Sequence, residues 1–360
     1  MKTIEQKLIS LGQEVNHPCV TISLNTHRTH PDSEQDKILL KNLVKDAENR
    51  ILELYGKREV KGLLDKLYAV EDTIDVNYNL DSLHIFLSND TKEIIKSMWP
   101  VAHNSVQVDD RFAVRSLIKS SNRVEEYYIM VLSQSGVQLY DAVNDRIVEE
   151  IKEGEFPYPA TPYFLPNAEK ASDGKQVDNM IREYINKVDQ AFVKIHNGTD
   201  LGCVVICTEE NYRHLMEVAN KPGIYLGNVS KDYNNASVHQ LATQAWEFIK
   251  DLQFKRRTAA IEEVQAAISQ GKVVTDLQEI YQASIDGRAD LLVVNMNYTQ
   301  PAMMTGDRTF DYIDDPATPE AVDDIVSSIA WETLSKNGRV VFTSQESLNN
   351  LGQIALKVRY

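Results

Sequence analysis

The chain has 360 residues, of which 42% are hydrophobic and 25% charged, and its formal net charge is −15. This length suggests two or three domains, and the longest apolar runs fall short of the roughly 20 residues that cross a bilayer. The acidic balance opposes non-specific attachment to nucleic acid, so any RNA contact has to be local. The first residues show no signal-peptide pattern, and we expect a cytoplasmic protein without a membrane segment.

Three cysteines are too few for a disulfide framework, and Cys19 and Cys203 lie in apolar runs typical of strands. A thiol in such a place behaves as a small hydrophobic group. The chain has no Walker loop, no Gly-x-Gly-x-x-Gly after a strand and no Gly-x-Ser-x-Gly elbow. We therefore expect neither a cofactor nor a bound metal.

The first third of the chain reads as an α/β unit. Residues 18–28, "PCVTISLNTHR", form a β-rich run that enters a polar loop, and the helix that follows has apolar residues on one face. These apolar positions are Leu40, Leu43, Val44, Ala47, Ile51 and Leu54. A second helix over 60–68, a strand over 82–88 and the segment 105–118 complete a unit that ends near Asn122.

The middle third begins with three predicted strands over 127–150, which reverse at Ser135-Gly136 and at Asn144-Asp145. Residues 153–174 hold four prolines and no periodicity, which indicates a long loop. An amphipathic helix over 177–192, a strand and helix over 201–219 and a strand over 222–230 follow.

The last third alternates helices with strands, as an α/β sandwich does. Helices are predicted from Ser237, from Thr258 to Ser269, from Asp276 to Ile285 and from Pro319 to Leu334. Strands are predicted over 290–296, 339–344 and 354–360. Gly287 fits a C-terminal helix cap, and Asp323 and Asp324 fit the start of the last helix. The predicted domains are 1–122, 123–233 and 234–360.

Three stretches in this order resemble the bacterial relatives of archaeo-eukaryotic class-I peptide release factors and of Pelota, the ribosome-rescue factor. They are "SLNTHRTHPDSEQDKILLKNLVKDAENRIL", "MVLSQSGVQLYDAVNDRIVEE" and "DLQEIYQASIDGRADLLVV". The resemblance implies an α/β fold of three domains: an N-terminal α/β domain, an RNase-H-like middle domain and a C-terminal α/β/α sandwich related to kink-turn-binding ribosomal proteins.

Release factors carry Gly-Gly-Gln in the loop before the middle-domain helix, and the nearest match here is Asp173-Gly174-Lys175-Gln176. Lysine in place of the second glycine removes the backbone freedom that glycine alone has. We therefore do not expect hydrolysis of the termination type. Ser172 or Asp173 could simply cap the helix, and the loop otherwise remains a candidate contact for RNA or protein.

A second candidate site is the polar loop after the first strand, with Thr26, His27, Arg28 and Lys41. Loops on a rigid scaffold often carry function, and Arg28 and Lys41 could hold a phosphate or carboxylate. The alternative is a solvated strand end. His27 and His30 are three residues apart, but no third zinc ligand lies nearby at finger-like spacing.

Basic residues of the last third are the remaining candidates for RNA contact. Lys255, Arg256 and Arg257 form the densest basic cluster, and Arg288 lies in a helix-to-strand turn. Short charge runs on helices are more often solvated faces.

The resemblance implies a factor bound to the ribosome or tRNA, with a translational GTPase as a delivery partner, acting in rescue, hibernation or quality control. Two other classes stay open. One is an enzyme, a peptidyl-tRNA hydrolase or a nuclease, although the middle strands supply only Asp141 toward a two-metal site. The other is a protein-interaction adaptor without RNA binding, which the charge of −15 favours.

Overall fold

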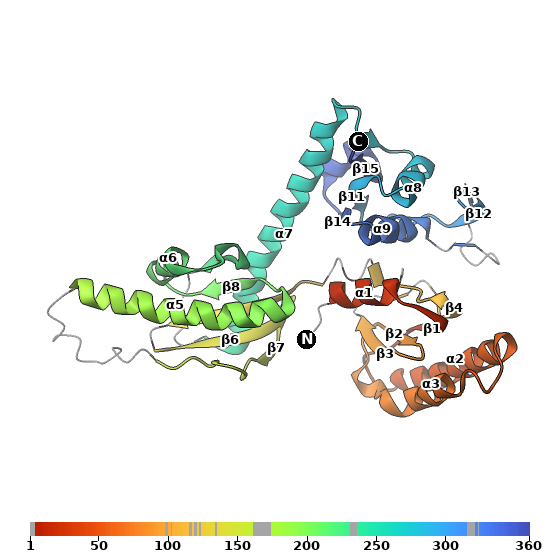
Figure 1. Cartoon of the computed structure of the whole chain (residues 1–360), viewed down its shortest axis with the longest axis horizontal. Coiled ribbons are helices and arrows are strands. Elements are labelled where there is room, and N and C mark those ends of the chain that lie inside the picture. The colour runs from red at the N-terminus through yellow and green to blue at the C-terminus, as the bar shows by residue number, and fades with distance from the viewer. Residues whose placement is uncertain are drawn as a thin grey trace. The chain divides into compact units, whose positions relative to one another are not determined.

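The computed structural model describes residues 4–97, 100–101, 103–114, 117–118, 121, 124–133, 135–160, 174–230, 236–314, 321–322 and 324–360. The chain divides into two compact units. We call residues 124–256 the middle unit, and residues 4–123 together with 257–360 the terminal unit. Both combine helices with sheets, which confirms the predicted α/β class (Figure 1). The division into three domains at 122 and 233 stays a prediction, and residues 122 and 233 lie outside the described part.

The first sheet of the terminal unit has four antiparallel strands in the order β3-β2-β1-β4. They are β1 (Val15–Asn25), β2 (Ser82–Leu87), β3 (Lys92–Ser97) and β4 (Ser105–Arg111). β1 and β2 match the predicted strands, and β4 lies in the segment 105–118, for which no element type was predicted. β3 was not predicted, because its three charged residues outnumber its two apolar ones, Ile94 and Ile95.

Helices α2 (Ser33–Leu54) and α3 (Lys61–Thr73) pack on one face of this sheet, and a short 3-10 turn, η1 (Val76–Tyr78), leads into β2. The predicted apolar face of α2 is confirmed at Leu40, Val44, Ala47 and Ile51, which are buried. Leu54 was wrongly placed there: it ends the helix and is exposed.

The opposite face of the same sheet is covered by α1 (Ile4–Gln13). Leu8 and Leu11 of α1 share one hydrophobic cluster with Phe86 of β2 and with Ile329 near the C-terminus. The first and last thirds of the chain are therefore joined through a common core.

The second sheet of the terminal unit has the order β10-β15-β11-β14, in which only β11 and β14 run parallel. These strands are β10 (Val273–Val274), β11 (Ala289–Asn295), β14 (Arg339–Thr343) and β15 (Ile354–Val358). Helices α8 (Leu277–Ile285) and α9 (Ile325–Ser335) pack on one face. The C-terminal half of α7 (Val238–Ile268) and η4 (Glu346–Leu351) pack on the other, which gives three layers.

Three predictions for this region need correction. α7 is one continuous helix from Val238 to Ile268 rather than two, because no proline or glycine interrupts it. α9 begins at Ile325, not at Pro319, because the backbone of Val322 pairs with Ala302 and stays extended. The hairpin of β12 (Ala302–Gly306) and β13 (Thr309–Tyr312) was not predicted from the sequence.

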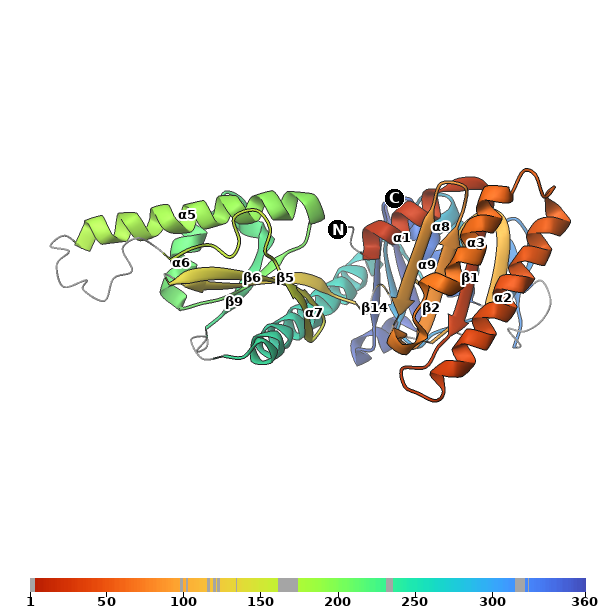
Figure 2. The ribbon, with the colours of Figure 1, turned by 90° about the horizontal axis from the view of Figure 1, so that it is seen from below.

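The middle unit has a five-stranded mixed sheet in the order β7-β6-β5-β8-β9 (Figure 2). The strands are β5 (Glu126–Ser133), β6 (Gly136–Val143), β7 (Arg146–Glu150), β8 (Cys203–Ile206) and β9 (Tyr225–Val229). β6 runs antiparallel to β5 and to β7, whereas β5, β8 and β9 are mutually parallel. An RNase-H-like identity of the middle unit stays a prediction.

Helices α5 (Gly174–Thr199) and α6 (Glu209–Val218), with the short η3 (Pro222–Ile224), cover one face of the middle sheet. The N-terminal half of α7 covers the other. The predicted turns are confirmed, because Gly136 and Asn144 both have positive φ, at 132° and 53°. No described helix is long and apolar enough to span a membrane.

Candidate functional site

The loop after β1 is fixed by its own hydrogen bonds. Thr26 is buried, its hydroxyl donates to the carbonyl of Leu80 (2.7 Å), and its backbone N–H donates to the carbonyl of Asp81 (3.0 Å). Thr26 therefore anchors the loop to the chain before β2, and its hydroxyl proton is not available to a ligand.

His27 and Asp36 form a carboxylate–imidazole pair. Oδ2 of Asp36 accepts from the backbone N–H of His27 (2.7 Å), and Oδ1 lies 2.7 Å from Nδ1 of the ring. The carboxylate is 2% exposed, whereas the imidazole is 51% exposed. The hydrogen bond from Asp36 raises the pKa of His27 above its ordinary value. An ionised Asp36 fixes the proton on Nδ1 and leaves Nε2 for an outside partner.

The guanidinium of Arg28, predicted as an anion contact, already forms an ion pair within the protein. Its Nε and Nη2 atoms donate to both oxygens of Asp81, at 2.7 and 2.6 Å. This bidentate bond engages the guanidinium N–H groups that would otherwise donate to a phosphate. Lys41 on α2 is exposed and has no hydrogen bond or ion pair within the described residues. Of the residues predicted for this site, Lys41 is the one whose charge has no partner within the described part of the chain.

The stretch matched to Gly-Gly-Gln is described in part. Asp173 lies outside the described residues, and the backbone of Gly174, Lys175 and Gln176 forms the first turn of α5. Cap bonding by Ser172 or Asp173 also lies outside them. The described part thus places the glutamine backbone in a helix.

A charged cluster that sequence reasoning missed joins α5 to α6 one turn further on. Nε2 of the buried His214 lies 3.4 Å from Oδ1 of Asp178, and Arg182 bridges Asp178 (3.3 Å) and Glu217 (3.0 Å). Arg213 donates to Glu217 (2.6 Å). The three-and-four spacing of these residues was the signal for it. The cluster holds the two helices together beside the start of α5.

A hollow lined by Ser133, Ser135, Gly136, Gln138 and Tyr158, among others, lies at the turn between β5 and β6. The hydroxyls of Ser133 and Ser135 are 2.7 Å apart, and Tyr184 donates to the carbonyls of Ser133 (3.2 Å) and Pro159 (3.0 Å). In the sequence, this hollow corresponds to the Ser135-Gly136 turn and to the start of the proline-rich loop.

The predicted basic cluster lies within α7. Lys255 and Arg256 are exposed, Arg257 is half-buried, and Arg256 forms an ion pair with Glu125 (3.4 Å). Arg288 lies with its guanidinium 6.0 Å from the ring centre of Tyr360. Gly287 ends α8 with φ of 69°, and the N–H of Arg288 donates to the carbonyl of Ala283 (2.9 Å), which confirms the predicted cap.

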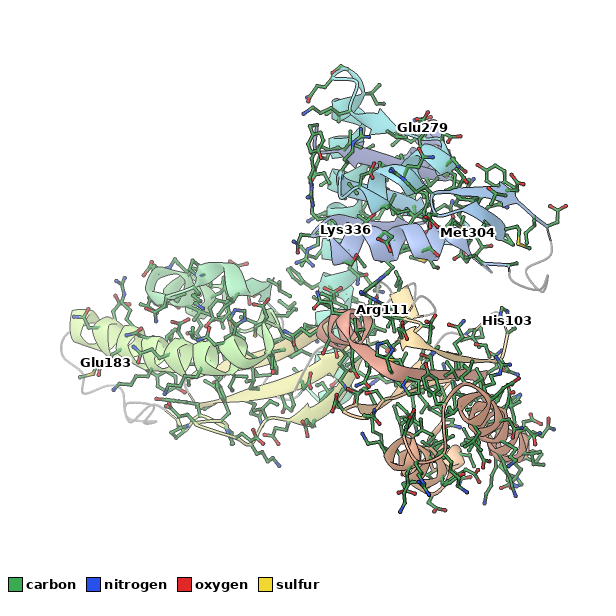
Figure 3. All side chains as sticks on the ribbon, turned by 45° about the vertical axis from the view of Figure 1, so that its right-hand side comes forward. His103, Arg111, Glu183, Glu279, Met304 and Lys336 are labelled. Atoms are coloured by element: carbon green, nitrogen blue, oxygen red, sulfur yellow. The ribbon has the colours of Figure 1, made fainter. Side chains whose placement is uncertain are left out.

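Burial raises the pKa of the thiols and of one carboxyl in the described part of the chain. All three cysteines are buried, and burial raises the pKa of Cys19 to about 11. Burial also raises the pKa of Asp141, whose cross-strand partner is Glu149. The described residues contain no group of three or more His, Cys, Asp or Glu side chains placed to hold a metal. Side chains are drawn in Figure 3, where Glu183 marks α5 and Lys336 the end of α9.

Residues 126–288 match the model of the Bacterial archaeo-eukaryotic release factor family 3. The predicted resemblance is confirmed. The matched segment begins at β5 and ends with the turn after α8. None of the curated proteins matches the chain.

Solved structures of release-factor-like proteins are also similar. An archaeal translation termination factor, aRF1, is 13% identical, with a TM-score of 0.26 over 100% of this chain and 99% of that one. Archaeal Pelota, from a model of ribosome-bound Pelota and ABCE1, is 13% identical, with a TM-score of 0.40 over 100% and 95%. Dom34 from S. cerevisiae, a translation termination-like factor, is 11% identical, with a TM-score of 0.38 over 78% and 74%. Because these identities and TM-scores are low, the functional proposal is based on the family match alone.

Proposed function

We propose that this chain is a cytoplasmic translation factor that binds the ribosome or tRNA and acts by occupying its site, without hydrolysis of the Gly-Gly-Gln type. The match of residues 126–288 to a release-factor family carries the proposal. Rescue, hibernation or quality control of ribosomes are the roles we propose, with a translational GTPase as delivery partner.

Two features of the middle unit support the part of the proposal that concerns chemistry. The residue before Gln176 is a lysine, and the backbone from Gly174 onward is helical. A Gly-Gly-Gln loop needs a backbone that extends freely into a narrow site, which a lysine within a helical turn opposes. Occupancy then remains as the mode of action.

Sedimentation of the tagged, full-length chain with ribosomes from growing and from starved cells tests the proposal. We expect the protein in the ribosome pellet in at least one of these states, with binding that weakens as salt rises. A protein that stays in the supernatant in every growth state contradicts it.

A protein-interaction adaptor is the second candidate. Two observations favour it: the net charge of −15, and the pairing of Arg28 with Asp81. An adaptor would stay out of the ribosome pellet and bind a protein instead, so the same experiment separates the two functions.

A further inference from the structure

The exposed face of α2 carries lysines at Lys37, Lys41 and Lys45, one every fourth residue. Residues this far apart lie above one another on a helix, with a rise of about 6 Å from each to the next. All residues from Gln35 to Lys45 are described, and none of the carboxylates among them is exposed. Acids flank this stretch, with Glu34 exposed before it and Asp46 42% exposed after it, so the positive row is short and belongs to a chain of charge −15.

The single acid in this stretch, Asp36, does not neutralise the lysines. Its carboxylate is 2% exposed, and both oxygens are engaged by the backbone N–H and the ring of His27. The bonds to His27 therefore hold the Asp36 carboxylate inside the protein. The side chains of Lys37, Lys41 and Lys45 are exposed to water.

Two of the three lysines have no ionic partner within the described residues. Lys37 and Lys41 are exposed, and only Lys45 is paired, with Glu48 at 2.6 Å. Exposed lysines of α5 differ in this respect: Lys187 pairs with Glu183 (2.8 Å), and Lys194 pairs with Glu155 (2.7 Å). Lys37 and Lys41 of α2 therefore differ from these two lysines of α5.

We propose that Lys37, Lys41 and Lys45 contact successive phosphates along an RNA strand. The choice of RNA as the polyanion rests on the proposed function. Ammonium groups are point charges without the fork that reads a base or orients a single phosphate. The row therefore binds the backbone at any sequence.

Contact between these lysines and phosphates has a measurable signature, which is the dependence of affinity on salt concentration. Each phosphate contact releases a counterion, which contributes about 0.7 to the slope of log affinity against log salt on a single strand. Replacing Lys37 and Lys41 by glutamine leaves α2 intact, because lysine and glutamine have similar helix propensities. The slope should then fall by about 1.4.

The test compares the full-length wild-type chain with K37Q/K41Q and with K187Q/K194Q, which changes the net charge equally at paired lysines. The probe is a fluorescein-labelled oligouridylate, titrated between about 50 and 200 mM salt. We expect K37Q/K41Q to lose affinity severalfold with the reduced slope, whereas K187Q/K194Q behaves as wild type. Melting curves of all three proteins should coincide.

Equal affinity and slope in K37Q/K41Q and wild type would overturn the inference. If wild type and K37Q/K41Q sediment alike with ribosomes at every salt concentration, the inference fails and the proposed function stands. Absence of wild type from the ribosome pellet contradicts the proposed function, while the oligouridylate titration still decides the role of α2. Binding to polyglutamate but not to oligouridylate, lost in K37Q/K41Q, would instead assign the row to an acidic protein.

Discussion

The indole of Trp331 on α9 lies directly against Gly12 on α1, and a Cβ atom at position 12 would be 2.0 Å from its Cη2 atom. Only glycine permits this approach, which closes the core shared by the first and last thirds of the chain. Gly12→Ala should therefore destabilise the terminal unit by about 1–3 kcal/mol, the usual cost of overpacking.

Calorimetric melting of the full chain measures this loss. Gly62→Ala is the matched control, because Gly62 lies in α3, a Cβ atom added there would have no neighbour within 4 Å, and alanine is the better helix former. Combining Gly12→Ala with Trp331→Ala should give a loss smaller than the sum of the two single losses. A Gly12→Ala protein as stable as wild type would show that α1 and α9 can move apart without cost.

Asp189 is a fully buried carboxylate that ties α5 to the chain before β9. It accepts from the N–H (2.9 Å) and Nδ2 (2.7 Å) of Asn220 and from the hydroxyl of Tyr225 (2.8 Å). Asp189→Ala leaves several buried donors unpaired, each at about 1–3 kcal/mol, and should therefore be the more costly change. Tyr225→Phe removes one bond and should cost about 1 kcal/mol. Urea unfolding of both variants checks the order, and similar losses in the two would contradict it.

Glu263 of α7 accepts from Arg339 (2.6 Å) and Lys357 (2.7 Å), and these bonds lower its pKa to about 2. A depressed carboxyl pKa stabilises the fold above the unfolded value near 4.5, and this contribution is lost as pH falls toward 2. Because the group is about one-third exposed, salt should weaken the effect. Glu263→Gln should flatten stability between these pH values, and Glu262→Gln, at an exposed neighbour, should not.

The pKa of His27 should fall when Asp36 is replaced by asparagine, since the carboxylate is the main cause of its raised value. The extra stability from the His27–Asp36 bond is present below pH 6.5 and is lost as pH rises through the raised pKa. Titration of the imidazole resonances by NMR measures both proteins, with His27→Gln to identify the signal. An unchanged midpoint in Asp36→Asn would mean that the carboxylate does not carry the shift.

Peptide release tests the chemical side of the proposed function. Purified protein added to terminated ribosomes should release no more peptide than buffer does, and Gln176→Ala should change nothing. Robust release that Gln176→Ala abolishes would show that Lys175 is tolerated within a catalytic loop.

Hydrophobic periodicity was sufficient for the elements that bury one face. The pattern of α2 and the Ser-Gly and Asn-Asp turns around β6 predicted those elements because their signals are local. β12 and β13 escaped prediction because they are only five and four residues long, too short for a recognisable pattern, and they are held by pairing across the hairpin. The continuity of α7 was also missed, because its two halves contribute to two different cores.

The sequence by itself determined the α/β class, the release-factor resemblance and the residue types of the candidate sites, because these depend on spacing along the chain. Only the tertiary structure decided which charges remain available. Asp81, distant in sequence, pairs with Arg28, and Asp36 turns inward to His27, whereas Lys37 and Lys41 of α2 have no ionic partner within the described residues. Electrostatic pairing acts through space over a few ångströms, and side chains that meet at that distance need not be near in sequence.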